Sequence, residues 1–239
     1  MACHQRSTSL PSLPYSTDLN VEQELQTLKV HISSPSATIG TACDGLRRLA
    51  DAYSCIEEIM YFPRNQALTH QRKTVEEELE KSLVLIDTCN AMQESLAELK
   101  TSVQELRLVL KRGDDVAAQI KMESFFRLAK KAQKPLKKTI GKSTAEGCSC
   151  RLVRLLAEAR ETAVSVLEST SRHLSKQIGS PSGSKWSIVS KKFQKTKVIC
   201  EERQLQALEH TMGDLEDGVE FLFKRLIQSR VSLLNILSL

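Results

Sequence analysis

The sequence predicts an all-α fold, an elongated antiparallel helical bundle of about four long helices plus shorter ones, behind a disordered N-terminal tail. Only 4% of the 239 residues are aromatic, and 9 Gly and 6 Pro leave little with which to build the turns and pleats of a sheet. Apolar residues instead recur at steps of three and four, which is the helical period. Pro63, Pro135 and Pro181 divide the chain into pieces that can fold back on one another, which disfavours a single long dimeric coiled coil.

The chain divides into a tail and one predicted domain. Residues 1–17 are rich in Ser and Pro and form the tail, whereas residues 18–239 form the helical bundle domain, with flexible breaks near 137–147 and 179–184. No apolar run approaches the roughly 18 residues of a membrane span, and the first residues lack a secretory signal. Seven cysteines, an odd number, indicate reduced thiols. We therefore expect an intracellular, cytoplasmic protein, and the Ser-rich start makes a plastid location the alternative.

The first two helices are predicted from two separate apolar stripes. A short amphipathic helix is expected over 18–33, where the apolar residues are Val21, Leu25, Leu28 and Ile32. The first long helix has Ser34 as a candidate N-cap, Pro35 in its first turn and Pro63 as its stop. Its apolar stripe comprises Ile39, Ala42, Leu46, Leu49, Tyr53, Ile56 and Met60.

The longest helix is predicted from about Arg72 to Arg112, with Gly113 as the C-terminal stop. Asp114 is a good N-cap for the next helix, which Pro135 interrupts. The predicted stripe of the long helix comprises Val75, Leu79, Leu83, Ile86, Cys89, Met92, Leu96, Leu99, Val103, Leu106 and Leu110, and that of its successor comprises Val116, Ile120, Phe125, Leu128, Ala129 and Ala132.

Two further long helices complete the predicted bundle. The apolar pattern resumes over 150–178, and the segment 179–184 (GSPSGS) then breaks it. The last helix repeats an alternating three-four heptad through Leu205, Leu208, Met212, Leu215, Val219, Leu222 and Leu226, continued by Leu233 and Leu237. Gly213 and Gly218 each weaken this helix by about 1 kcal/mol relative to Ala, so packing must hold it.

No motif in the chain points to catalysis, to a cofactor or to a metal. The tripeptide at 141–143 (GKS) lacks the first glycine of a phosphate-binding loop, and Cys148 with Cys150 lacks the spacing of a zinc site. The acidic run at 76–80 (EEELE) is typical of a solvated helix face. We therefore expect a protein that is not an enzyme and that has no catalytic, cofactor-binding or metal residues.

The most suggestive surface is basic and amphipathic. Two lysine-rich segments carry apolar residues on the opposite helical face, a pattern that suits an acidic protein groove or an anionic lipid surface. The alternative is that these lysines only keep the protein in solution. Trp186 and Phe193 alone offer stacking, so nucleic acid is not an expected partner. The candidate contact surface comprises Arg127, Lys130, Lys131, Lys134, Lys137, Lys138 and Lys142, then Lys185, Trp186, Lys191, Lys192, Phe193, Lys195 and Lys197.

Several stretches resemble a plant family, the domain of unknown function 241, which is allied to the BYPASS proteins. Within that family the sequence most resembles members from grasses. The most specific stretch is DLEDGVEFLFKRLIQSRVSLLNILS, and others are SSPSATIGTACDGLRRLADAYSCIEEIM and RKTVEEELEKSLVLIDTCNAMQESLAELKTSVQELRLVLKRGDD. The resemblance implies an all-helical protein of land plants, linked to root and shoot development and to restraint of a mobile root-derived signal. It supplies no reaction, ligand or catalytic residue.

Residues and resemblance together favour a non-enzymatic regulatory or scaffold protein that binds a protein partner through a helix face. The identity of that partner and the oligomeric state stay open at this point. The alternatives are an enzyme or enzyme subunit in small-molecule signal metabolism, and a bundle that binds weakly to an anionic membrane surface.

Overall fold

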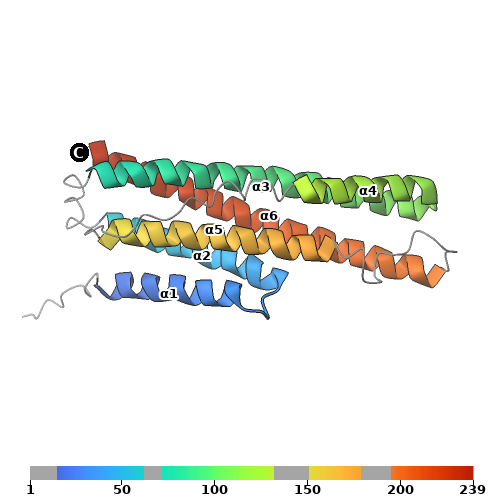
Figure 1. Cartoon of the computed structure of the whole chain (residues 1–239), viewed down its shortest axis with the longest axis horizontal. Coiled ribbons are helices and arrows are strands. Elements are labelled where there is room, and N and C mark those ends of the chain that lie inside the picture. Colours follow the sequence, from blue (N-terminus) through green and yellow to red (C-terminus); the bar gives the residue numbers. More distant parts are fainter. Residues whose placement is uncertain (1–14, 62–71, 132–150, 179–194, 239) are drawn as a thin grey trace, which may run out of the picture.

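The computed structural model describes residues 15–61, 72–131, 151–178 and 195–238, and within these ranges the chain forms six α-helices and no strand (Figure 1). Four of the helices are long, with 22 to 44 residues, and two are shorter, with 19 and 17. The expected all-α class with about four long helices is therefore confirmed. The helices are α1 (Tyr15–Ser33), α2 (Ile39–Met60), α3 (Arg72–Arg112), α4 (Asp115–Lys131), α5 (Arg151–Ile178) and α6 (Lys195–Ser238).

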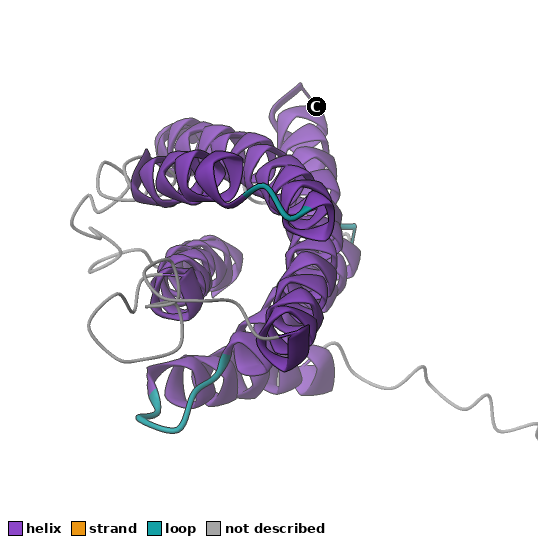
Figure 2. Cartoon of the chain, turned by 90° about the vertical axis from the view of Figure 1, so that its right-hand side faces the viewer, coloured by secondary structure: helices purple, strands orange, loops and turns teal. Residues whose placement is uncertain are grey.

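Successive helices run in opposite directions along one long axis, so the predicted elongated antiparallel bundle is confirmed (Figure 1). Helix α6 makes its most extensive contacts with α3 and α2, whereas α4 packs mainly on α3 and α1 mainly on α2. Helix α5 contacts α1, α2, α3 and α4. A view along the long axis shows the other helices in an arc with α5 on its concave side (Figure 2).

The start of α2 corrects the predicted cap. Ser34 closes α1 instead, because its backbone N–H donates to the carbonyl of His31 at 3.3 Å. The N-cap is Thr38, whose hydroxyl accepts from the backbone N–H of Thr41 at 3.3 Å while the Thr41 hydroxyl accepts from that of Thr38 at 3.2 Å. This reciprocal capping box satisfies two backbone donors at once, so Pro35 belongs to the turn and not to the helix.

Most other helix boundaries agree with the sequence. Helix α3 ends at Arg112, and the next residue, Gly113, has a φ of 72°, the left-handed conformation that favours glycine at a helix stop. Asp114 caps α4, because its carboxylate accepts from the backbone N–H of Ala117 at 2.9 Å. Helix α6 begins at Lys195, well before the first heptad residue Leu205. The predicted tail up to residue 14, the breaks at 137–147 and 179–184, and the three dividing prolines lie outside the described residues.

The heptad seam of α6 is the centre of the core. Its residues from Leu205 to Leu226, together with Leu233, are each at most 5% exposed. Gly218 lies in this seam for a packing reason, because a Cβ atom built there would be 3.2 Å from the Cβ of Leu46 on α2. The glycine that weakens helix propensity therefore permits close approach of α2 and α6. Within the described ranges no helix combines the length and the apolar composition needed to cross a bilayer.

One position of the predicted α3 stripe is wrong. Leu83 is 46% exposed, and the core instead takes Leu85, which is 1% exposed. The reason is the direction of each side chain around the helix axis. The buried seam runs from Leu79 to Ser82 by a step of three residues and from Ser82 to Ile86 by a step of four. A step of four straight to Leu83 turns that side chain out of the interface.

Candidate functional site

The structure describes part of the predicted basic contact surface. Arg127 and Lys131 are exposed side chains on α4. Lys130 belongs to α4, and Lys195 and Lys197 to the start of α6, but their side chains lie outside the described part of the structure. The other predicted contact residues lie outside the described ranges altogether: Lys134, Lys137, Lys138, Lys142, Lys185, Trp186, Lys191, Lys192 and Phe193.

Helix α4 is an amphipathic helix that lies along the second half of α3. Its inner face buries Ala118, Phe125 and Ala129, each at most 7% exposed. The rings of Phe125 and Phe126 are tilted by 54° with their centroids 6.1 Å apart, a usual aromatic arrangement. These apolar contacts hold the helix in place and fix which of its faces points to solvent.

The outer face of α4 exposes apolar residues as well as basic ones. Val116 and Ile120, predicted to face the core, are 72% and 59% exposed, so that prediction is wrong. Neighbouring α3 adds Leu108, which is 54% exposed at the end of the same hairpin. The cause of the error is that α4 packs on one side only, and Val116 and Ile120 lie nearly half a turn around the helix from that side, where they remain in water. We call Val116, Ile120 and Arg127 the α4 outer face.

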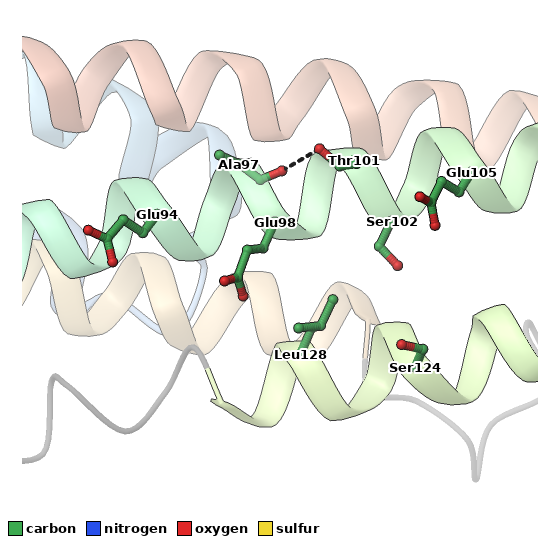
Figure 3. A pocket seen from close by; sticks show the side chains of 8 residues that line it. All are labelled: Glu94, Ala97, Glu98, Thr101, Ser102, Glu105, Ser124 and Leu128. Atoms are coloured by element: carbon green, nitrogen blue, oxygen red, sulfur yellow. Dashed lines mark hydrogen bonds between the residues drawn. The ribbon is translucent and has the colours of Figure 1, made fainter.

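An open groove of about 610 Å³ lies between α3 and α4 (Figure 3). Two ion pairs join the helices across it: Lys121 Nζ lies 2.6 Å from Glu105 Oε2, and Lys131 Nζ lies 3.3 Å from Glu98 Oε2. Two carboxylates of the groove, Glu98 and Glu105, thus bind lysines of the same hairpin. The residues that line it are Glu94, Ala97, Glu98, Thr101, Ser102, Glu105, Ser124 and Leu128.

A buried ion pair was missed from the sequence. Glu78, part of the acidic run predicted to be solvated, is 5% exposed, and its Oε1 accepts from Arg160 Nε on α5 at 2.8 Å. Tyr53 on α2 is buried nearby, and burial, followed by the Glu78 charge, raises the pKa of its phenol. The only sequence signal is position, because Glu78 precedes Leu79 on the inner face of α3. This cluster joins α2, α3 and α5.

A second charged network joins α3 to α6. Arg107 pairs with Glu209 through Nη1 and with Glu202 through Nη2, the latter at 3.3 Å. Lys111 Nζ also reaches Glu202, at 2.9 Å. Two turns earlier on α3, Lys100 Nζ lies 2.9 Å from Glu216 Oε2. We call these contacts the α3–α6 ladder.

The thiols that the structure describes have low reactivity. Burial, with smaller contributions from Asp214 and other nearby charges, raises the pKa of Cys43 to about 11, and burial raises that of Cys89 to about 12. Burial also raises the pKa of the half-buried Cys55. Because the thiolate is the reactive form, these groups behave as small apolar side chains. No group of three or more His, Cys, Asp or Glu residues in the described ranges is arranged to hold a metal ion.

Comparison with known proteins identifies the family. A family model described as Protein BPS1 matches residues 45–204 and 192–236, which is most of the chain. A search of curated proteins and a search of solved structures each found no match. The sequence resemblance to the BYPASS-related plant proteins is thereby confirmed, and the chain belongs to the BPS1 family.

Proposed function

We propose that this protein is a non-enzymatic regulatory or scaffold protein of plant development, which acts by binding a protein partner through the α4 outer face. Membership of the BPS1 family supports the developmental role. The observation that carries the binding role is the exposure of two large aliphatic residues, Val116 at 72% and Ile120 at 59%, on a helix that is otherwise anchored by Phe125.

The chemistry of this face favours a groove of matching character on the partner. Val116 and Ile120 are four residues apart, and Arg127 follows after two further turns, so the three side chains lie along one line on the helix. An apolar groove with an acidic rim buries such a stripe in the way known for amphipathic helices. The basic residues that continue the chain beyond Lys131 extend the same complementarity toward an acidic partner.

The features of the α3–α4 groove favour a binding protein over an enzyme. The groove is open to solvent, and two of its carboxylates are already in ion pairs with Lys121 and Lys131. Catalytic sites usually exclude water from the reacting groups, and a groove open to solvent does not. An anionic membrane surface remains the alternative partner for the basic residues.

Proximity labelling in plant cells tests the proposal. The full chain, fused to a labelling enzyme, is compared with a Val116→Glu, Ile120→Glu variant and with a matched control, Val30→Glu, which changes a residue 68% exposed on α1. The expected result is that a defined set of neighbours is lost in the α4 variant and kept in the control. Equal neighbours in all three proteins would overturn the proposal.

The membrane alternative has its own test. Liposome co-sedimentation compares vesicles of neutral lipid with vesicles that contain anionic lipid, using the wild-type chain and a variant with Lys130, Lys131, Lys134, Lys137 and Lys138 changed to Gln. Binding to anionic vesicles that the variant loses would assign the basic residues to lipid. No binding to either vesicle removes the membrane as a partner.

A further inference from the structure

Helix α3 is much longer than the helix that covers its outer side. It has 41 residues, whereas α4 has 17 and lies beside the second half of α3 only (Figure 1). The first half of the same outer side therefore has no helix against it in the described part of the structure. We call Glu77, Glu80, Val84 and Asp87, all of which are exposed, the open α3 face.

The open α3 face continues the surface on which α4 is docked. Residues 84, 91, 98 and 105 are spaced by seven, as are residues 80, 87, 94 and 101, so each row lies along one line of the helix. The later members of both rows, Glu98, Thr101 and Glu105, line the groove against α4. The earlier members are placed to receive a helix in the same way.

Helix α4 shows which kind of helix this surface accepts. It inserts Phe125, which is 1% exposed, and Ala118 and Ala129 toward the core. It then places Lys121 against Glu105 at 2.6 Å and Lys131 against Glu98 at 3.3 Å. The docked helix is therefore amphipathic, with lysines spaced along the edge that meets the acidic rows of α3.

The open α3 face offers the same two features, namely apolar side chains and carboxylates beside them. Val84 in the row is 49% exposed and Leu83 beside it is 46% exposed, so two successive large aliphatic side chains face solvent here. Glu80 and Asp87 flank them, and neither has an ion pair with any residue in the described ranges, whereas Glu76 on a neighbouring line pairs with Arg72. Apolar side chains between carboxylates that have no ion pair within the described residues are complementary to a lysine-bearing apolar helix.

We propose that the open α3 face is a docking site for a basic amphipathic helix of a protein partner, which would lie on α3 end to end with α4. This surface is distinct from the α4 outer face, because it uses different residues on a different helix. A partner bound here would extend the existing α3–α4 interface by roughly two to three heptads, given the rise of about 1.5 Å per residue.

The test uses the full chain and a labelled synthetic peptide of residues 115–131, a helix with the required chemistry. Fluorescence anisotropy at low salt measures its dissociation constant for the wild-type chain, for Glu80→Lys, Asp87→Lys and for a matched control, Asp44→Lys, Asp51→Lys, which reverses two exposed carboxylates on α2. We expect binding that weakens roughly tenfold or more in the first variant, that stays unchanged in the control and that falls with added salt.

Several results would overturn the proposal. These are no binding by the wild-type chain, an equal loss in both variants, or binding that Glu80→Lys, Asp87→Lys leaves intact. If the peptide bound only after Lys134, Lys137 and Lys138 were changed to Gln, the occupant of the open α3 face would be the chain's own basic segment and not a partner. A dimer in sedimentation equilibrium that the Glu80→Lys, Asp87→Lys variant dissociates would assign it to a second copy.

Discussion

Helix α3 uses charged side chains to hold its neighbours in two different environments. Near its start, Glu78 and Arg160 form a single pair whose side chains are only 6% and 12% exposed. Toward its end, the α3–α6 ladder joins several partners whose side chains are 20% to 54% exposed, with Arg107 and Glu209 at the low end. The first contact is one buried bond between α3 and α5, and the second is a wide hydrated network between α3 and α6.

The difference teaches that burial, and not the number of ion pairs, decides what breaking a charged contact costs. A buried charge that loses its partner keeps its desolvation penalty, so removing one member is strongly destabilising. A half-exposed charge that loses its partner is solvated at once, so the same change costs little. The ladder therefore contributes alignment of α3 with α6 more than it contributes stability.

The largest effect should come from a buried carboxylate that has no partner at all. Leu222 on α6 is fully buried, so Leu222→Asp should lower the free energy of unfolding by more than about 4 kcal/mol and unfold the carboxy-terminal helix. Thermal unfolding followed by circular dichroism measures this. The control is Phe221→Asp, because Phe221 is 37% exposed and loses mainly a contact with Arg225, 5.3 Å from its ring centre. An unchanged melting temperature in Leu222→Asp would contradict the packing described for α6.

The next largest loss of stability should come from removing the ion-pair partner of Glu78. Arg160→Met removes the guanidinium that binds this carboxylate at 2.8 Å, and we expect a loss of about 3 kcal/mol in urea unfolding. Adding Glu78→Leu to the same chain should recover most of the loss, because the pair is then replaced by apolar groups. Failure of the double variant to recover would show that the pair itself stabilises the fold.

A smaller effect is expected in the ladder. Arg107→Met breaks the contacts with Glu202 and Glu209, and we expect a loss of about 1 kcal/mol or less at low salt. The difference from the wild-type chain should vanish in about 1 M salt, where charges are screened beyond about 3 Å. A loss as large as that of Arg160→Met would refute the role assigned to burial.

The smallest effect concerns pH. Hydrogen bonds from Lys111 and Arg107 lower the pKa of Glu202, and those from Gln104 and Arg107 lower that of Glu209. Because the folded pKa lies below the unfolded one, the ladder stabilises the fold above the unfolded carboxylate pKa of about 4.3 and loses this contribution as pH falls further. Urea unfolding between pH 7 and pH 3 should show a shallower acid loss for Glu209→Gln than for the wild-type chain. A variant with the same pH profile would exclude this residue as a source of acid sensitivity.

Local chemistry made most helix boundaries predictable. Gly113 and Asp114 mark the end of α3 and the start of α4 through backbone conformation and capping, which depend only on nearby residues. The heptad of α6 likewise predicts its own buried face, because every repeat faces the same way. The cap of α2 was the exception, since Ser34 and Thr38 are both good caps and the turn between the helices decides between them.

The site residues were harder to predict because their surroundings are set by distant parts of the chain. Glu78 differs from the other carboxylates of its run only through Arg160, which is 82 residues away. Val116 and Ile120 continue an apolar pattern, yet their exposure depends on how few helices cover α4. Of the basic surface, Arg127 and Lys131 are exposed on α4, and the partner that Lys131 contacts, Glu98, depends on the α3–α4 register.

The place of α6 in the bundle has a consequence for biosynthesis. Its 44 residues are the main neighbour of both α3 and α2, yet they are translated after both of those helices. While α6 is still inside the ribosome, it does not yet cover the long apolar faces of α2 and α3. Those faces can then bind chaperones or aggregate with other unfolded chains. The core of this bundle is therefore completed only once α6 has left the ribosome, and a stop codon before α6 would leave the apolar faces of α2 and α3 exposed.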